Sequence, residues 1–365
     1  MFTDIIARLS KWASGRTEAP QRVLLYPTNN CNLNCVFCYQ QLKPYDYSLR
    51  LSKEKWLAIT KELCKMGVKT LQISGGGEPF LESDTVLSIM RIIKKYDVEG
   101  RLVTNGTVLT RQIIEQIVDI GWDHIIFSID GAKPGTHDFL RGKKGSFKRT
   151  VEAISLFRKI KQEKKAEKPL LEFSSVLTKK NFKQSKDIIK LAHELGVGVI
   201  TFEPVFVSNP YVQKIKMNSF QRKKFIKRIP ESLEIAKSLG INTNLKTIDE
   251  IREIEKTGEL KDKIIGNQEI NKKTNNFFDI PCYDPWLWPK IEADGRIGPC
   301  SSIIFEGMNI KSKTFKELWL GKSFSEFRVR IRSKDLPDSC ANCVSTHLPL
   351  NNAIRNKLRE AVCNG

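Results

Sequence analysis

The sequence predicts an α/β fold: a partial (β/α)6 barrel of the TIM type, followed by a small C-terminal domain with a β-hairpin and a helix. Short apolar segments alternate with helical patterns from about residue 22 to about residue 205, and after Cys282 turn residues and closely spaced cysteines take over. The 365 residues therefore divide into an N-terminal amphipathic segment (1–21), a core barrel (22–210), a helical connector (211–279) and a cysteine-bearing domain that ends in a helix (280–365).

Six segments of the core are predicted to be strands: R-V-L-L-Y-P-T, T-L-Q-I-S-G, R-L-V-T-N, H-I-I-F-S-I-D, L-E-F-S-S-V-L-T and V-G-V-I-T-F-E-P. They are short and apolar on both faces, which is typical of a parallel sheet covered by helices. Helical patterns lie between them, and one of these begins after Ser52 as N-cap and stops at Gly67. Six units fit an open barrel better than a closed one of eight. A doubly wound sheet stays an alternative, because the sequence does not reveal strand order.

The segments outside the core have patterns of their own. Residues 2 to 12 place apolar side chains at helical spacing; we predict that this helix docks on its own domain, with contact to a membrane surface as the alternative. The connector is lysine-rich and mostly helical in pattern. In the C-terminal domain, I-E-A-D-G-R-I-G-P-C predicts a hairpin with its turn at Asp294-Gly295, and F-K-E-L-W predicts a short helix.

Composition narrows the class of protein. Apolar content is 40%, no apolar run approaches the roughly 18 residues of a membrane span, and no signal peptide is recognisable. Nine cysteines without an export signal indicate a reducing cytoplasm and favour metal ligands or free thiols over disulfides. The net charge of +20 is compatible with an acidic substrate, nucleic acid or anionic lipid. Because the lysines are spread over many helices and no RNA-reading motif occurs, we interpret it as solvated helix faces.

Three cysteines follow the first predicted strand as C-x3-C-x2-C: Cys31, Cys35 and Cys38. No fourth ligand is near, whereas a structural zinc site needs four closed ligands. A 4Fe–4S cluster has four irons, so three thiolates leave one iron free to bind a small molecule. The motif therefore indicates a reactive metal centre with an open coordination site.

This motif, with the aromatic Phe37 before its last cysteine, resembles the signature of the radical S-adenosylmethionine (radical SAM) enzymes. The resemblance implies a 4Fe–4S cluster held by Cys31, Cys35 and Cys38, whose open iron binds S-adenosylmethionine. One electron, expected from a flavodoxin- or ferredoxin-type donor, then cleaves the sulfonium to methionine and a 5′-deoxyadenosyl radical, which abstracts hydrogen from a substrate. The motif lies after the first strand, where the active face of a barrel is expected.

Further motifs at the ends of later strands agree with this resemblance. S-G-G-G-E-P-F resembles the family's "GGE" element, which implies that the backbone of Gly75, Gly76 and Gly77, together with Glu78, receives the methionine amino group. V-T-N-G places Asn105 at the end of the third strand.

The remaining cofactor contacts are expected at the later strands. By resemblance, Ser128 in F-S-I-D-G and Arg149 in G-S-F-K-R-T hold the methionine carboxylate, for which the planar donors of an arginine are suited. Asp130 is expected near the same pocket, and Arg141 is a further candidate. V-I-T-F-E-P falls where the family packs the adenine, and the sequence leaves open whether Ser174 or Ser175 faces the ribose.

Four more cysteines lie in the C-terminal domain: Cys282, Cys300, Cys340 and Cys343. Together with G-M-N-I and F-K-E-L-W, they resemble the auxiliary-cluster domain called SPASM and its shortened form, twitch. The two closely spaced cysteines that end the full SPASM pattern are missing, so the resemblance implies one auxiliary 4Fe–4S cluster with four cysteine ligands. A zinc site of four cysteines is the alternative that spacing also allows.

Two cysteines are left over, and no catalytic residue can be named from the sequence. Cys363 and Cys64 are candidates for returning a hydrogen atom to a substrate radical, although Cys64 in a helix is typical of core packing. His124, His137, His193 and His347 show no ligand spacing.

The cysteine pattern resembles that of twitch-bearing inosamine dehydrogenases, which implies dehydrogenation or epimerisation of a small sugar-like substrate. The alternative is modification of a ribosomally made peptide, by a thioether or another crosslink. A non-catalytic binding protein of the radical SAM type and a tRNA-modifying enzyme are further alternatives. Sulfatase maturation fits less well, because Ser301 stands where those relatives carry an aspartate.

Overall fold

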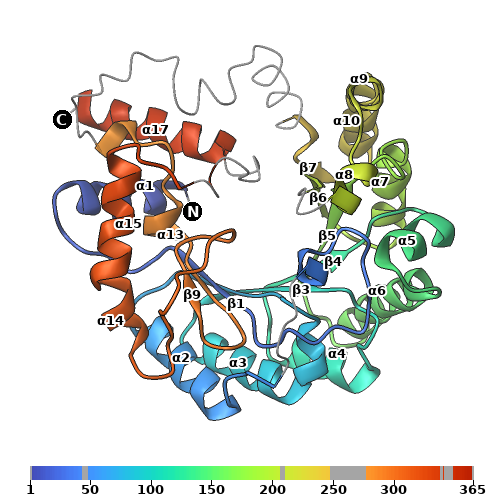
Figure 1. Cartoon of the computed structure of the whole chain (residues 1–365). Coiled ribbons are helices and arrows are strands. Elements are labelled where there is room, and N and C mark those ends of the chain that lie inside the picture. The colour runs from blue at the N-terminus through green and yellow to red at the C-terminus, as the bar shows by residue number, and fades with distance from the viewer. Residues whose placement is uncertain are drawn as a thin grey trace.

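The structure is a computed structural model that describes residues 2–42, 48–205, 210–246, 277–337, 340 and 348–363. Its strands form one sheet in the order β7-β6-β5-β4-β3-β2-β1-β8-β9 (Figure 1). These strands are β1 (Arg22–Leu25), β2 (Thr70–Ile73), β3 (Glu99–Thr104), β4 (His124–Ser128), β5 (Leu170–Leu177), β6 (Val199–Pro204), β7 (Asn242–Thr243), β8 (Lys290–Ile291) and β9 (Ile297–Gly298).

The strand order decides between the two folds that the sequence allowed. From β1 to β6, each strand pairs in parallel with the next strand of the chain. In a doubly wound sheet the strand order reverses at one point, whereas in a barrel neighbouring strands follow one another in chain order. The open barrel is therefore confirmed, and all six predicted core strands are present.

Helices cover the outer face of this sheet (Figure 1). Ser52 caps α2 by accepting a hydrogen bond from the backbone N–H of Lys55, and Gly67 follows the helix with a φ of +86°, so both predicted helix boundaries are confirmed. The outer helices are α2 (Lys53–Lys65), α3 (Ser83–Lys95), α4 (Arg111–Asp119), α5 (Pro134–Arg141), α6 (Ser146–Glu163) and α7 (Ser185–Glu194).

The inner face of the barrel is polar near the amino ends of its strands. Nη2 of Arg101 lies 2.7 Å from Oε2 of Glu172, and Nδ1 of His124 lies 2.6 Å from Oε1 of the same carboxylate. The Arg101 guanidinium and His124 help to hold the pKa of this carboxyl low against the effect of burial. These contacts occupy the amino end of the interior, and the cavity described below lies at the carboxyl ends of the strands.

The sheet continues beyond the core at both edges. At one edge β7, from the connector, pairs with β6; at the other, β8 pairs in parallel with β1, through Leu24↔Lys290 and Leu25↔Ile291. The connector is therefore not only helical. Gly295, with a φ of +87°, forms the predicted turn between β8 and β9.

The remaining described elements are short helical turns of the core and the helices of the connector and the C-terminal domain. The predicted helix F-K-E-L-W is present as α14, which begins with a capping box of Thr314 and Glu317. The elements are η1 (Tyr39–Leu42), η2 (Pro79–Glu82), α8 (Pro210–Ile215), α9 (Ser219–Ile226), α10 (Ile229–Ser238), η3 (Phe277–Asp279), α13 (Asp284–Leu287), α14 (Phe315–Trp319), α15 (Lys322–Arg332) and α17 (Leu348–Cys363).

The N-terminal helix α1 (Phe2–Ala13) docks on the C-terminal domain. Its Ile5 and Leu9 are buried in one cluster with Ile354 and Leu358 of α17. The helix therefore docks on its own chain, as predicted, although its partner is the C-terminal domain. Among the described residues, no helix has both the length and the apolarity that a membrane span requires.

We expect Leu9→Ala to lower the free energy of unfolding by about 2–5 kcal/mol, because it removes a fully buried side chain between α1 and α17. Leu81→Ala is the matched control: Leu81 is 41% exposed, and its loss should cost less than about 0.5 kcal/mol. Urea unfolding followed by circular dichroism measures both. Equal effects of the two substitutions would contradict the docking of α1.

Candidate active site

A cavity of about 360 Å³ lies at the carboxyl ends of the core strands. Residues at or just beyond the carboxyl ends of β1 through β6 line it, as expected for the active face of a barrel. Eleven residues predicted from the sequence are among them: Cys31, Cys35, Phe37, Cys38, Gly75, Gly76, Gly77, Glu78, Asn105, Ser128 and Arg141.

Main-chain hydrogen bonds hold the cysteine-bearing loop on two sides. On the β2 side, the N–H of Gly77 donates to the carbonyl of Thr28 over 2.9 Å, and that of Glu78 to the carbonyl of Asn30 over 2.8 Å. On the α5 side, the N–H groups of Asn34 and Val36 donate to the carbonyls of Arg141 and Leu140. The loop therefore has a defined course although most of it belongs to no helix or strand.

Two of the three glycines after β2 are in close contact with this loop, whereas a Cβ on Gly75 would meet the carbonyl of Gly77 in the same turn. A Cβ on Gly77 would lie 1.8 Å from the carbonyl oxygen of Asn30, and one on Gly76 would lie 2.1 Å from Oδ1 of Asn29. No side chain fits at these distances, so only glycine lets the backbone after β2 approach the cysteine loop.

Glu78 joins the ends of β2 and β3. Its carboxylate accepts hydrogen bonds from the hydroxyl of Thr104 (2.7 Å), the N–H of Asn105 (2.8 Å) and the N–H of Phe80 (3.2 Å). Burial raises the pKa of this carboxyl group, and the three donors oppose the shift. A buried carboxylate at the wall of a cavity is suited to receive an ammonium group, the role that the resemblance gives it.

Asn105 connects β3 to the cysteine loop. Its Nδ2 donates to Oδ1 of Asn32 over 3.0 Å, and its Oδ1 accepts from the N–H and the hydroxyl of Thr107. Asn32 in turn donates to the hydroxyl of Thr107. The end of β3 thus fixes the loop segment between Cys31 and Cys35.

The structure brings Arg141, and not Arg149, to the cavity. Arg149 is exposed on α6 and does not line it, which corrects the expectation that Arg149 contacts the cofactor there. Arg141, at the end of α5, is buried, lines the cavity and lies over the ring of Phe37. Asp130 is fully buried behind it and pairs with its Nε at 2.6 Å.

Strand alternation settles which serine of β5 faces inward. Ser175 is fully buried, whereas Ser174 is partly exposed and shares its face with Val176, which lines the cavity. Ser174 is also paired in register with Ser128. Ser174 is therefore on the cavity face, and Ser175 points toward the helices.

Cys64 is excluded as a hydrogen donor in this cavity. It is buried in the core on α2, and it does not line the cavity. Burial raises the pKa of its thiol to about 11. The side chain of Cys363, the other candidate, lies outside the described residues, and so does Cys343.

All three cysteines of the loop line the cavity. The resemblance implies that they hold a 4Fe–4S cluster, in which each cysteine binds a different iron. Burial raises the pKa of Cys31 and of Cys35, so cluster binding has to displace protons from these thiols.

In the C-terminal domain, Cys282, Cys300 and Cys340 are partly buried. Burial and the carboxylate of Asp284 raise the pKa of Cys300 to about 11, which the backbone N–H groups of Ser302 and Ile303 oppose. The fourth predicted ligand is the undescribed Cys343, so the set as a whole stays a prediction.

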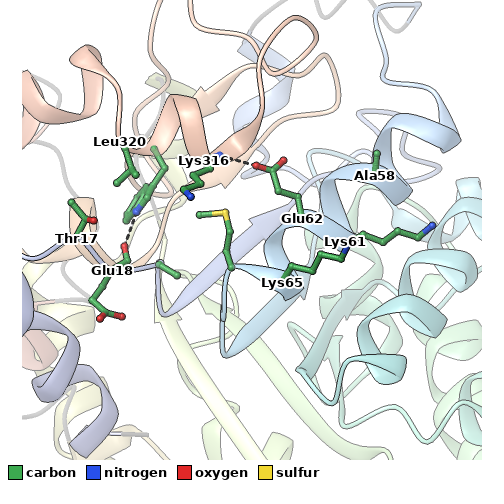
Figure 2. Close-up of a pocket in the computed structure, with 11 residues that line it drawn as sticks. Thr17, Glu18, Ala58, Lys61, Glu62, Lys65, Lys316 and Leu320 are labelled. Atoms are coloured by element: carbon green, nitrogen blue, oxygen red, sulfur yellow. Dashed lines mark hydrogen bonds between the residues drawn. The ribbon is translucent and has the colours of Figure 1, made fainter.

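A larger hollow of about 730 Å³ lies elsewhere, between α2, residues 17–19 and α14 (Figure 2). Here Glu62 accepts the backbone N–H groups of Phe315 and Lys316, and the indole N–H of Trp319 donates to the carbonyl of Glu18. Its lining contains no cysteine, and its hydrogen bonds join the core to the C-terminal domain. The smaller cavity is therefore the candidate active site because cysteines line it, and its size does not decide the matter.

Sequence reasoning missed two features of the cavity. Asn29 supports the loop by accepting a hydrogen bond from Gln40. Glu203 lines the cavity at the end of β6, the core strand farthest from β1 in the strand order. The signal for Asn29 was the polar run T-N-N directly after the first strand; Glu203 had only its position at a strand end.

Comparison with known proteins identifies both parts of the chain. Residues 25–171 match the radical SAM superfamily, and residues 282–344 match the iron–sulfur cluster-binding domain SPASM. S-adenosylmethionine, a 4Fe–4S cluster and an auxiliary cluster, all predicted above, are the cofactors of these two domains.

Two relatives align over most of the chain. The AdoMet-dependent heme synthase of Methanosarcina barkeri is 26% identical over 90% of this chain and 89% of its own length. A PqqA peptide cyclase of Ruegeria pomeroyi is 24% identical over 89% of this chain and 80% of its own.

Solved structures share the fold. Streptococcus suis SuiB bound to its precursor peptide SuiA aligns with 93% of this chain and 73% of its own, with a TM-score of 0.64 and 14% identity. The structure of anSMEcpe with bound AdoMet aligns with 90% and 88%, with a TM-score of 0.60 and 19% identity. At such identities the likeness concerns the architecture of barrel and C-terminal domain.

We expect Gly77→Ala to lose iron and sulfide from the three-cysteine site, because the new Cβ would displace the loop at Asn30. Chemical analysis of anaerobically purified protein measures the loss. Gly198→Ala is the control, since a Cβ there meets nothing within 4 Å. Normal iron content in the Gly77 variant would show that the loop tolerates the shift.

Affinity for S-adenosylmethionine should decrease as the pH falls through the raised pKa of Glu78, because the protonated carboxyl group no longer attracts an ammonium group. Glu78→Gln should bind more weakly at neutral pH and lose this pH dependence. Isothermal titration calorimetry across pH measures both effects. If the natural protein and Glu78→Gln show the same pH profile of S-adenosylmethionine binding, Glu78 is not the titrating group.

Proposed function

Because the chain belongs to the radical SAM superfamily and carries a C-terminal SPASM domain, we propose that it is a radical SAM enzyme that modifies a ribosomally made peptide. The observation that carries this proposal is the recurrence of PqqA peptide cyclases among the relatives, one of them aligned over 89% of this chain. This favours the peptide alternative of the sequence analysis over the sugar-like substrate expected first.

When bound, the cluster and S-adenosylmethionine supply a 5′-deoxyadenosyl radical that removes a hydrogen atom from the substrate, and an auxiliary cluster supplies a site for the electron that an oxidised product gives up. The chain's own residues hold and orient these groups. Cys31, Cys35 and Cys38 would hold the cluster, and Glu78 would receive the amino group of S-adenosylmethionine. Ser128 would contact its carboxylate from the end of β4.

The architecture supports a substrate larger than the cavity. In the described residues the sheet does not close, since β7 and β9 stand at its two ends and do not pair with each other. A cavity of about 360 Å³ is at the small end of ligand pockets. We infer that the cofactor occupies most of it and that the substrate reaches its rim, where Glu203 and Val205 lie.

A second candidate function is heme synthesis, which is favoured by the relative of that name aligned over 90% of this chain. The two functions differ in the kind of substrate, a peptide or an iron porphyrin. One set of assays that offers both kinds of substrate therefore distinguishes the two functions.

The deciding experiment supplies anaerobically reconstituted protein with dithionite, S-adenosylmethionine and either a peptide encoded beside its gene or an iron porphyrin. The proposal expects 5′-deoxyadenosine and a peptide whose mass is lower by two hydrogen atoms per crosslink. Heme formation with an unchanged peptide would favour the second candidate. No 5′-deoxyadenosine with either substrate or without one would favour a non-catalytic binding protein.

Cys35→Ala should abolish the reductive cleavage of S-adenosylmethionine, because it removes one of the three thiols at the cavity. Cys64→Ala is the matched control and should cleave normally, since Cys64 is buried on α2 away from the cavity. Chromatographic quantification of 5′-deoxyadenosine compares them. Retained cleavage in the Cys35 variant would remove that cysteine from the cluster site.

A further inference from the structure

Arg141 makes an unusually direct approach to one of the cysteines. Its Nη1 lies 3.8 Å from Sγ of Cys35, within hydrogen-bond distance for sulfur. The guanidinium carbon also lies 5.5 Å from the centre of the Phe37 ring. Only 9% of the side chain is exposed, so its charge is little screened by solvent.

Asp130 fixes this guanidinium from behind. Its Oδ2 lies 2.6 Å from Nε of Arg141, and its Oδ1 accepts the backbone N–H of Val176 over 2.7 Å. The backbone of Asp130 is held as well, since its carbonyl accepts a hydrogen bond from Asn181. The carboxylate, which follows β4 and is bonded to Val176 of β5, therefore orients Arg141.

The backbone around Arg141 belongs to the same arrangement. Its carbonyl accepts the N–H of Asn34, in the cysteine loop. Gly142 ends α5 with a φ of +65°, and a Cβ on it would lie 1.9 Å from the carbonyl oxygen of Asn34. The last turn of α5 thus contacts the loop through both main chain and side chain.

A buried ion pair is not needed to stabilise this packing. Removing two charges from water costs several kcal/mol, and apolar side chains of similar volume are often at least as stabilising. Hydrogen bonds and positive charge beside the sulfur ligands of an iron–sulfur cluster, in contrast, make the cluster easier to reduce. The location of the pair at Cys35 thus favours a role in electron uptake.

We propose that Arg141, positioned by Asp130, donates a hydrogen bond to the cysteine ligand Cys35 and raises the reduction potential of the three-cysteine cluster. Arg141 is thus a positioning and tuning residue for the step in which the cluster accepts an electron. The inference rests on the radical SAM part of the proposed function and does not depend on the identity of the substrate.

The test is a redox titration of the cluster, followed by electron paramagnetic resonance without S-adenosylmethionine or substrate. It uses full-length chains in which Cys282 and Cys300 are replaced by alanine, so that the auxiliary cluster does not contribute. Arg141→Gln should lower the ratio of reduced to oxidised cluster at a given potential at least tenfold, equivalent to 59 mV for one electron. Arg141→Lys, which keeps the charge, should recover part of this loss.

Two further variants keep the test decisive. Arg149→Gln is the matched control on the exposed face of α6, and its potential should equal that of the parent. Asp130→Asn removes the carboxylate that holds the guanidinium of Arg141 and should lower the potential, because Arg141 is then no longer held at Cys35. This variant tests the proposal even if Arg141→Gln fails to bind iron.

The proposal is overturned if Arg141→Gln binds iron and keeps the parent potential, or if Asp130→Asn leaves the potential unchanged or raises it. Weaker binding of S-adenosylmethionine by Arg141→Gln at an unchanged potential would mean that Arg141 acts only on the carboxylate of the ligand. None of these measurements involves a peptide or a porphyrin, so they are independent of which substrate the enzyme uses.

Discussion

The candidate site depends on main-chain hydrogen bonds that hold the cysteine loop between β2 and α5. The loop is largely irregular, and its N–H and carbonyl groups are bonded to Gly77 and Glu78 on one side and to the last turn of α5 on the other. These bonds require very close approach, which the glycines after β2 and Gly142 permit. The cysteines reach the cavity because two neighbouring elements fix the backbone that carries them.

The sheet links this site to the C-terminal domain. Because β8 pairs with β1, the domain that carries the auxiliary cysteines extends the sheet beside β1, the strand that precedes the cysteine loop. Lys290 of β8 is buried, pairs with Glu292 at 3.0 Å and donates to the carbonyl of Ser301, next to Cys300. Core and C-terminal domain are thus parts of one sheet, with a candidate cluster site on each.

The sequence predicted those features that depend on local pattern. The strands followed from short apolar runs. The glycines, Glu78, Asn105 and Ser128 followed from motifs at strand ends and from their resemblance to those of the radical SAM family. Contacts between distant segments could not be predicted. The spacing of Arg141 and Arg149 does not show which of them points inward; that depends on how α5 meets the cysteine loop. Likewise, the pairing of β8 with β1 joins segments far apart in the chain, for which no local signal exists.

The central claim is that Cys31, Cys35 and Cys38 hold a cluster with one iron open to S-adenosylmethionine. The most direct test is the electron paramagnetic resonance spectrum of the reduced cluster, recorded before and after S-adenosylmethionine is added to protein whose auxiliary cysteines have been replaced. A changed spectrum is expected, because the ligand binds directly to iron. An identical spectrum at saturating ligand would contradict the account.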